Sequence, residues 1–336
     1  MHAAERTEAR LSSAHGNSAR DDRALASSGR VPVSVHGLGV YYRRFFDAGT
    51  DYFARVCAEH TFQALTESTK PGTAHRTGIY LTPVTREGDE LHFRLLRCST
   101  NLSGPTDNFR ATDRAIVDEL NREADRIFEN HAPLNHVLAQ VYHNTPAGAE
   151  RKQTKARISA HADKTKDMPA NGVMAFCTFY DRLDKLNPLA SDPFDLGHNG
   201  VSGLTRLHFR RKASVSDRAL PAQFELTLYP DSAFFMPLST NRLYTHEIRA
   251  SMLAADLLPT RLGYVVRCSS AEAVHANGTT FLTRAGTRVA LGPATPEGAS
   301  ELRKLYADEN KTDAVIEYGD RFTFSLNAGD YLAPRV

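Results

Sequence analysis

Beyond Leu134 the chain is a succession of short segments rich in β-branched and aromatic residues, and this pattern limits its fold more than any other feature. Proline, glycine, aspartate and serine separate the segments, as turns separate the strands of antiparallel sheets. Six strands are predicted there, over residues 137–142, 173–180, 204–209, 224–229, 233–236 and 262–268. The sequence has no regular strand–helix alternation, no GxGxxG and no P-loop motif, which argues against a nucleotide-binding α/β fold.

Two helices are predicted ahead of these strands. Residues 47–65 place aromatic and aliphatic side chains at helical spacing. Residues 112–130 carry one apolar stripe, with Thr112 as the expected cap and Asp113 in the first turn, where a negative charge suits the helix dipole. Helices followed by many strands indicate a mainly β, α+β chain with a barrel or sandwich braced by helices on one face.

The remaining segments complete the predicted organisation. Residues 1–30 are polar and aperiodic and are expected to form a disordered tail, and their acidic residues argue against a mitochondrial presequence. Residues 31–270 form the predicted main domain, with an insertion at about 181–222. Residues 271–336 are predicted as a C-terminal extension packed on the core, with strands at 279–283, 288–291 and 322–326 and a helix at 297–310.

Charge and cysteine usage exclude several classes of protein. The 336 residues include 41 basic and 39 acidic side chains, so a net charge of +2 argues against a strongly basic nucleic-acid clamp and leaves room only for a local patch. The four cysteines show no CxxC spacing, which argues against a zinc knuckle or a disulfide framework and favours a reducing, cytoplasmic or nuclear compartment. Because no run approaches the roughly 18 apolar residues of a membrane span, we expect a soluble protein.

The first candidate chemistry lies in the segment His161-Ala162-Asp163. On a strand, residues i and i+2 face the same side, so His161 and Asp163 can approach one ion. They supply two of the three ligands of the two-His-one-carboxylate face that holds non-haem Fe(II). In a chain with 14 histidines such a pair arises by chance roughly once. A third ligand is therefore needed, and His246 is the main candidate, with His198 in a Gly/Asn-rich loop as the alternative.

Two arginines follow His246 on a predicted strand. Arg261 and Arg267 are six residues apart, which places both on one face of an extended segment. Buried guanidinium groups need an anion to pair with them. A dicarboxylate co-substrate meets this requirement, with one carboxylate for each arginine or with one carboxylate on the metal.

Over roughly residues 35–270 the sequence resembles the AlkB-like family of Fe(II)- and 2-oxoglutarate-dependent dioxygenases. That family shows an Asn-x-Tyr strand, then His-x-Asp, a distal histidine and two arginines six residues apart. The corresponding residues here are Gln140-Val141-Tyr142, His161-Ala162-Asp163, His246, and Arg261 with Arg267. The resemblance implies a double-stranded β-helix, or jelly-roll, core.

The resemblance also implies a set of ligands and a substrate class. Iron would be bound by His161, Asp163 and His246 and would act with 2-oxoglutarate and O2. Arg261, helped by Tyr142, would pair with the distal carboxylate of 2-oxoglutarate, and Arg267 would lie near its metal-side carboxylate. The implied substrate is an alkylated or methylated nucleobase in DNA or RNA. The alternatives are the same chemistry on a small metabolite or a protein side chain, or a non-catalytic jelly-roll binding module.

Three departures from the family pattern bear on these expectations. Gln140 replaces the usual asparagine, and Gly263 stands where some members have a polar co-substrate contact. The interval from Asp163 to His246 is long. The first two changes affect the co-substrate pocket, whereas the long interval affects the choice of substrate.

Other residues receive a structural interpretation from the sequence. Basic runs at 151–157 and 210–212 are typical of solvated loops, although the Arg151–Arg157 run could contact the phosphates of single-stranded DNA or RNA. Cys177, in an apolar strand, is expected to be an inert buried thiol. His136, His143 and His208 are interpreted as structural or surface histidines. Tyr41, Tyr42 and Tyr80 are candidates for stacking on nucleobases but are interpreted as core or sheet residues.

Overall fold

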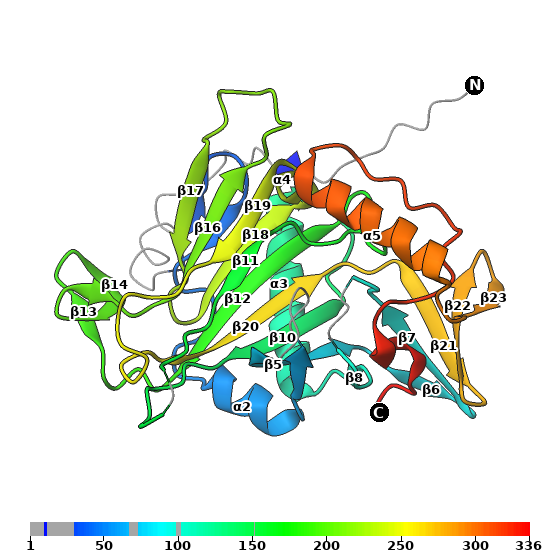
Figure 1. Cartoon of the computed structure of the whole chain (residues 1–336), viewed down its shortest axis with the longest axis horizontal. Coiled ribbons are helices and arrows are strands. Elements are labelled where there is room, and N and C mark those ends of the chain that lie inside the picture. Colours follow the sequence, from blue (N-terminus) through cyan, green and yellow to red (C-terminus); the bar gives the residue numbers. More distant parts are fainter. Residues whose placement is uncertain (1–9, 12–29, 67–72, 99–101, 151) are drawn as a thin grey trace.

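The structure, a computed structural model, describes residues 10–11, 30–66, 73–98, 102–150 and 152–336 (Figure 1). The predicted tail over 1–30 therefore lies almost wholly outside the described residues. The largest element is a nine-stranded sheet. In spatial order its path is β2 (Pro32–Ser34), β3 (Val40–Tyr42), β18 (Ser232–Pro237), β12 (Val173–Asp181), β20 (Thr260–Arg267), β10 (His136–Tyr142), β5 (Thr73–Thr82) and β4 (Gln63–Thr66), with β8 (Asp107–Asn108) beside β5.

A second, four-stranded sheet completes the core. Its order is β11 (Ile158–His161), β19 (Tyr244–Ile248), β16 (Arg206–Arg211) and β17 (Gln223–Thr227). From β10 to β20 the core strands alternate between the two sheets, except for the hairpin β16–β17, which lies wholly in the small sheet. The pairings β10–β20–β12–β18 and β11–β19–β16–β17 are antiparallel. This alternation is the topology of a double-stranded β-helix, so the predicted jelly-roll fold is confirmed.

The strands of the large sheet have two apolar faces. On β12, Met174 and Phe176 join a cluster with residues of the small sheet, including Leu207 and Phe209. The alternate positions Ala175 and Cys177 pack on the helix side. This period of two places one set of side chains inside the jelly roll and the other set under the helices.

Two helices cover the outer face of the large sheet, as Figure 1 shows. They are α2 (Tyr52–Glu59) and α3 (Ala111–Ile127). Val56 of α2 and Ile116 of α3 are fully buried in one cluster with Val137 of β10. The predicted bracing by N-terminal helices is confirmed, and burial of this apolar face is its source.

The ends of these helices differ from the sequence prediction. Helix α2 is shorter than 47–65 because the ring of His60, its C-cap, is held by two buried aspartates while the backbone becomes extended. Thr112 is not the cap of α3. The N-cap is Arg110, whose backbone N–H donates to the Asp113 carboxylate at 2.7 Å.

Residues beyond 270 share a sheet with an earlier part of the chain. This five-stranded sheet has the order β23 (Thr287–Ala290), β22 (Thr279–Arg284), β21 (Ala271–Ala276), β7 (Glu90–Leu95) and β6 (Thr85–Glu87). Helix α5 (Pro296–Lys311) and a short 3-10 helix, η1 (Ala328–Tyr331), follow. The strand predicted at 322–326 is wrong, because the carbonyls of Phe322 and Phe324 accept hydrogen bonds from the buried Arg97 side chain instead of from a neighbouring strand.

Smaller elements complete the described chain. Within the predicted insertion at 181–222, residues 187–202 form a separate sheet, whereas β16 belongs to the core. That separate sheet has the order β13 (Asn187–Leu189), β14 (Asp192–His198) and β15 (Val201–Ser202). The other elements are β1 (Arg10–Leu11), which pairs with β9 (Phe128–Glu129), and α4 (Leu238–Leu243). No helix within the described ranges is long and apolar enough to cross a membrane.

Candidate metal centre

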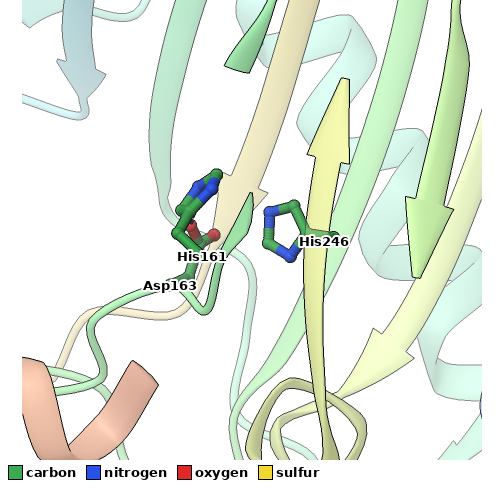
Figure 2. Close-up of side chains that lie close together, drawn as sticks. All are labelled: His161, Asp163 and His246. Carbon is green, nitrogen blue, oxygen red and sulfur yellow. Dashed lines mark ion pairs between the residues drawn. The ribbon is translucent and has the colours of Figure 1, made fainter. Parts of the chain in front are cut away.

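Strand pairing brings the three candidate ligands together. His161 is the last residue of β11 and lies directly opposite His246 of β19 in the antiparallel register. Their ring centroids are 4.4 Å apart, and one donor atom from each of His161, Asp163 and His246 lies within 4.8 Å of the other two. Figure 2 shows both imidazoles and the carboxylate gathered in the same space. Helix α4 lies between β18 and β19, the strand that carries His246.

The two histidines differ in exposure. His246 is 5% exposed and packs against the rings of Phe176 and Phe209. The His161 side chain is 33% exposed, so the cluster opens to solvent on the His161 side. Burial, and then the neighbouring His161, lower the pKa of His246 to about 3, which keeps its imidazole in the neutral form that binds metals.

The surroundings of this cluster fit a cation. The Nδ1 of His161 lies 2.9 Å from the carbonyl oxygen of Ser159 and must donate to it, so a neutral ring presents the lone pair of Nε2. That Nε2 is 3.6 Å from Oδ1 of Asp163, an arrangement that a shared cation stabilises. The buried Nδ1 of His246 has no hydrogen-bond partner among the described residues.

Arg267 orients the third ligand. Its Nη2 and Nε lie 2.8 Å and 3.1 Å from Oδ2 of Asp163, and both side chains are buried. Burial alone would raise the pKa of Asp163, but Arg267 and the two imidazoles outweigh it and hold that pKa well below its usual range. The carboxylate is therefore ionised. Its Oδ1, which does not bond Arg267, faces the imidazole of His161.

The second arginine lies on the same face of β20, at the other end of the strand. Arg261 is 6% exposed, and its guanidinium lies 4.0 Å above the ring of Tyr142, its register partner on β10. Its buried Nε has no hydrogen-bond partner among the described residues. The Tyr142 hydroxyl donates to Gln140 at 2.9 Å. A buried cation with a free donor beside two polar side chains is suited to an anionic group.

Gly263 provides the space for this arrangement. A Cβ atom there would lie 2.8 Å from Nη1 of Arg261 and 3.0 Å from Cε2 of Tyr142. The glycine that departs from the family pattern therefore allows the guanidinium to lie over the tyrosine ring. Each buried arginine was expected to meet an anion, and Asp163 fills that role for Arg267.

Sequence reasoning missed two residues beside this site. Arg76 lies opposite Tyr142 in the pairing of β5 with β10, and its buried Nε has no partner among the described residues. His136 lies opposite Arg267 and is 1% exposed. Its burial agrees with the interpretation as a core residue, but neither of its ring nitrogens has a hydrogen-bond partner in the described chain. Their places opposite Tyr142 and Arg267 become visible only once the strand register is known.

The other predicted residues lie outside the cluster. His198 is on β14 and is not one of the three clustered donors. His143 bonds Thr77 and His208 pairs with Glu225, which agrees with their structural interpretation. Cys177 is buried, and burial raises its pKa well above the usual value. The possible stacking residues Tyr41, Tyr42 and Tyr80 are all buried in the core.

The two basic runs differ from each other. Lys212 is buried and donates to the carbonyls of Glu309 and Thr312 at 2.7 Å and 3.1 Å. Arg211 is also engaged by nearby carbonyls, so the interpretation of 210–212 as a solvated loop is wrong for these two residues. In the first run Arg151 lies outside the described residues, whereas Lys152 and Arg157 are exposed just ahead of β11.

A second group of metal-ligand types has a different explanation. Glu59, His60 and Asp113 also cluster. However, His60 Nδ1 lies 3.0 Å from Asp107 and its Nε2 lies 2.7 Å from Asp113. Burial lowers the pKa of His60, but its bonds to the two aspartates outweigh this and raise it to about 9. This imidazolium is a buried ion-pair centre with no free ligand atom.

Comparison with known proteins gives likenesses of structure alone. No family model matches the chain, and no curated protein matches it in sequence. OsALKBH1 aligns with 11% identity and a TM-score of 0.41, over 71% of this chain and all of that one. The non-heme alpha-ketoglutarate-dependent epimerase SnoN of nogalamycin biosynthesis aligns with 12% identity and a TM-score of 0.38, over 76% and 85% of the two chains. A prolyl-4-hydroxylase of Pseudomonas putida aligns with 12% identity and a TM-score of 0.35, over 75% and 98%.

Proposed function

We propose that the protein is an Fe(II)- and 2-oxoglutarate-dependent dioxygenase. The observation that carries the proposal is the placement of two kinds of group, from the two sheets, in the interior of the jelly roll. His161, Asp163 and His246 offer three donor atoms within 4.8 Å of one another. Two guanidiniums lie on β20 of the large sheet. Arg267 contacts Asp163, and Arg261 has a buried, unpartnered donor. A metal-binding dicarboxylate would use both features.

In this proposal the three ligands bind Fe(II) on one face. The two-His-one-carboxylate set is typical of non-haem Fe(II) oxygenases and leaves coordination positions open. Arg267 keeps Asp163 ionised and turns its other oxygen toward the imidazoles. The carbonyl of Ser159 fixes the tautomer of His161, so that Nε2 is the atom available to the metal.

The co-substrate would lie between this face and the distal arginine. Arg261 would pair with the distal carboxylate of 2-oxoglutarate, and Tyr142 and Gln140 would supply the polar contacts beside it. When bound, Fe(II), 2-oxoglutarate and O2 supply the oxidation of a substrate C–H bond, coupled to formation of succinate and CO2. Hydroxylation of an N-methyl group would then lead to demethylation with loss of formaldehyde.

For the substrate we favour an alkylated or methylated nucleobase in single-stranded DNA or RNA. Lys152 and Arg157 support this choice, because they are exposed on the segment that leads directly to His161. Such side chains can contact phosphates without reading the base. A small metabolite or a protein side chain is the alternative substrate, and it would need no salt-sensitive contact with this segment.

Anaerobic addition of Fe(II) and 2-oxoglutarate tests the reaction class. We expect the weak visible charge-transfer band of the iron–2-oxoglutarate complex with the wild-type protein and none with His161→Ala. Arg261→Ala should still bind metal but should need far more 2-oxoglutarate. A wild-type protein that gives no band, or a His161→Ala variant that gives the same band, would support a non-catalytic binding module.

Succinate formation tests the substrate. With a panel of methylated single-stranded oligonucleotides and small metabolites, we expect the oligonucleotides to stimulate turnover in a salt-dependent way. Stimulation by metabolites alone would reject the nucleic-acid substrate and leave the reaction class intact.

A further inference from the structure

Strand pairing does not by itself place Asp163. Strand β11 ends at His161, so the aspartate lies two residues beyond the last paired position. Its side chain must nevertheless face His161 and His246 to complete the cluster. The backbone of residues 162–165 therefore needs another means of support, and two helices supply it.

The first support comes from α4. Asn241 is 2% exposed, and its Oδ1 accepts from the backbone N–H of Asp163 at 2.8 Å. Its Nδ2 donates to the carbonyl of the same residue at 2.9 Å. One amide thus holds both backbone groups of the ligand, and α4 leads directly into β19, which carries His246.

The second support comes from the end of α5, more than 140 residues further along the chain. The Oδ1 of Asn310 accepts from the backbone N–H of Ala162 at 2.8 Å, between the two ligands. The carboxylate of Glu309 accepts from the N–H of Thr165 at 3.0 Å. Lys212 of the core donates to the carbonyl of Glu309 at 2.7 Å, which fixes this end of the helix.

We propose that Asn241 and Asn310 are positioning residues of the metal centre, and that the C-terminal helix α5 is thereby part of the site. They hold the peptide units around Ala162 and Asp163 so that the carboxylate of Asp163 is presented toward the two imidazoles. This inference rests on the proposed metal binding by His161, Asp163 and His246. It also gives the segment after residue 270 a direct function.

Co(II) binding, followed by its visible absorption during a titration, tests this inference without requiring turnover. Groups that orient metal ligands typically change metal affinity about 10- to 100-fold, and we expect a loss in this range for Asn310→Ala and Asn241→Ala. Asn310→Asp keeps an oxygen acceptor for the N–H of Ala162 and should bind nearly as the wild type does. Lys304→Ala, an exposed change on the same helix, is the matched control and should have no effect.

Thermal unfolding of the same variants without metal separates positioning from general stability. A purely structural role would lower the melting temperature and leave the affinity of the folded fraction unchanged. Asn310 is only partly buried, so its variants allow the test even if Asn241→Ala fails to fold. Wild-type affinity in Asn310→Ala, or an equal loss in Asn310→Asp, would overturn the inference. Failure of the wild-type protein to bind Co(II) would instead overturn the proposed function.

Discussion

Replacement of Gly263 by alanine perturbs the surroundings of Arg261, the proposed partner of the distal carboxylate of 2-oxoglutarate, without removing any functional group. The added Cβ would lie 2.8 Å from Nη1 and 3.2 Å from Nη2 of Arg261, and 3.0 Å from Cε2 of Tyr142. Ordinary contacts between such atoms are about 3.5–4.0 Å, so the guanidinium must move by roughly 0.5–1 Å. The backbone of this strand position suits alanine, and the change itself favours the fold by about 0.5–1 kcal/mol.

The expected effect on co-substrate binding follows from this displacement. A hydrogen bond to a charged group contributes about 1.5–3 kcal/mol, and a displaced Arg261 would lose much of it. We therefore expect the Kd for 2-oxoglutarate to rise about 10- to 100-fold, since 1.4 kcal/mol corresponds to about tenfold. The melting temperature should remain within a few degrees of the wild type, because the atom nearest the added Cβ is the end of the flexible Arg261 side chain.

Calorimetric titration of 2-oxoglutarate into Mn(II)-loaded protein without oxygen measures this change. Gly148→Ala is the matched control, because no atom lies within 4 Å of a Cβ at that position, and it should leave the Kd unchanged. A wild-type Kd in Gly263→Ala would refute the reasoning that Arg261, in its place over Tyr142, is the anchor for the distal carboxylate.

Three further predictions concern stability and substrate binding. Arg267→Ala should lower the free energy of unfolding by about 3–5 kcal/mol, because it leaves the buried Asp163 carboxylate unpaired; a loss below about 1 kcal/mol in urea titrations would contradict this. The pKa of His60 is raised to about 9 in the folded protein, from about 6.5 in the unfolded chain. Protonated His60 should therefore stabilise the fold by about 3 kcal/mol below pH 6.5, and this contribution should be lost as the pH rises through 9. His60→Gln should abolish this pH dependence, and an unchanged profile would disprove the assignment. Replacing Lys152 and Arg157 together by alanine should reduce the salt dependence of oligonucleotide binding by about one unit of slope per lost phosphate contact, with 2-oxoglutarate affinity as the control; an unchanged slope would exclude these contacts.

The jelly roll could be predicted from sequence because most of its core strands carry a local signal, although β11 and β19 were not among the six predicted strands. Val173–Asp181 has the apolar run of a strand buried on both faces, and its period of two determines which side chains enter the interior. The strands that precede α3 were missed. In Thr73–Thr82 several polar residues interrupt the apolar pattern, and this strand is defined by its pairing with β10 rather than by its own composition.

The site was predictable to the extent that its residues share short spacings. The six-residue separation of Arg261 from Arg267 is enough to place both on one face of a strand. The short spacing of His161 and Asp163 brings them close together, although Asp163 lies beyond the end of β11. The partners of these residues were not predictable in this way. Asn310 reaches Ala162 from a distant helix, and such a contact depends on how the last segment packs on the core.

Diffraction from crystals grown with Mn(II) and 2-oxoglutarate, using the anomalous signal of the metal, tests the central claim most directly. We predict one metal ion bound by His161, Asp163 and His246, with the dicarboxylate extending from it to Arg261. Metal density bound by other residues, or a dicarboxylate that does not contact Arg261, would contradict the account.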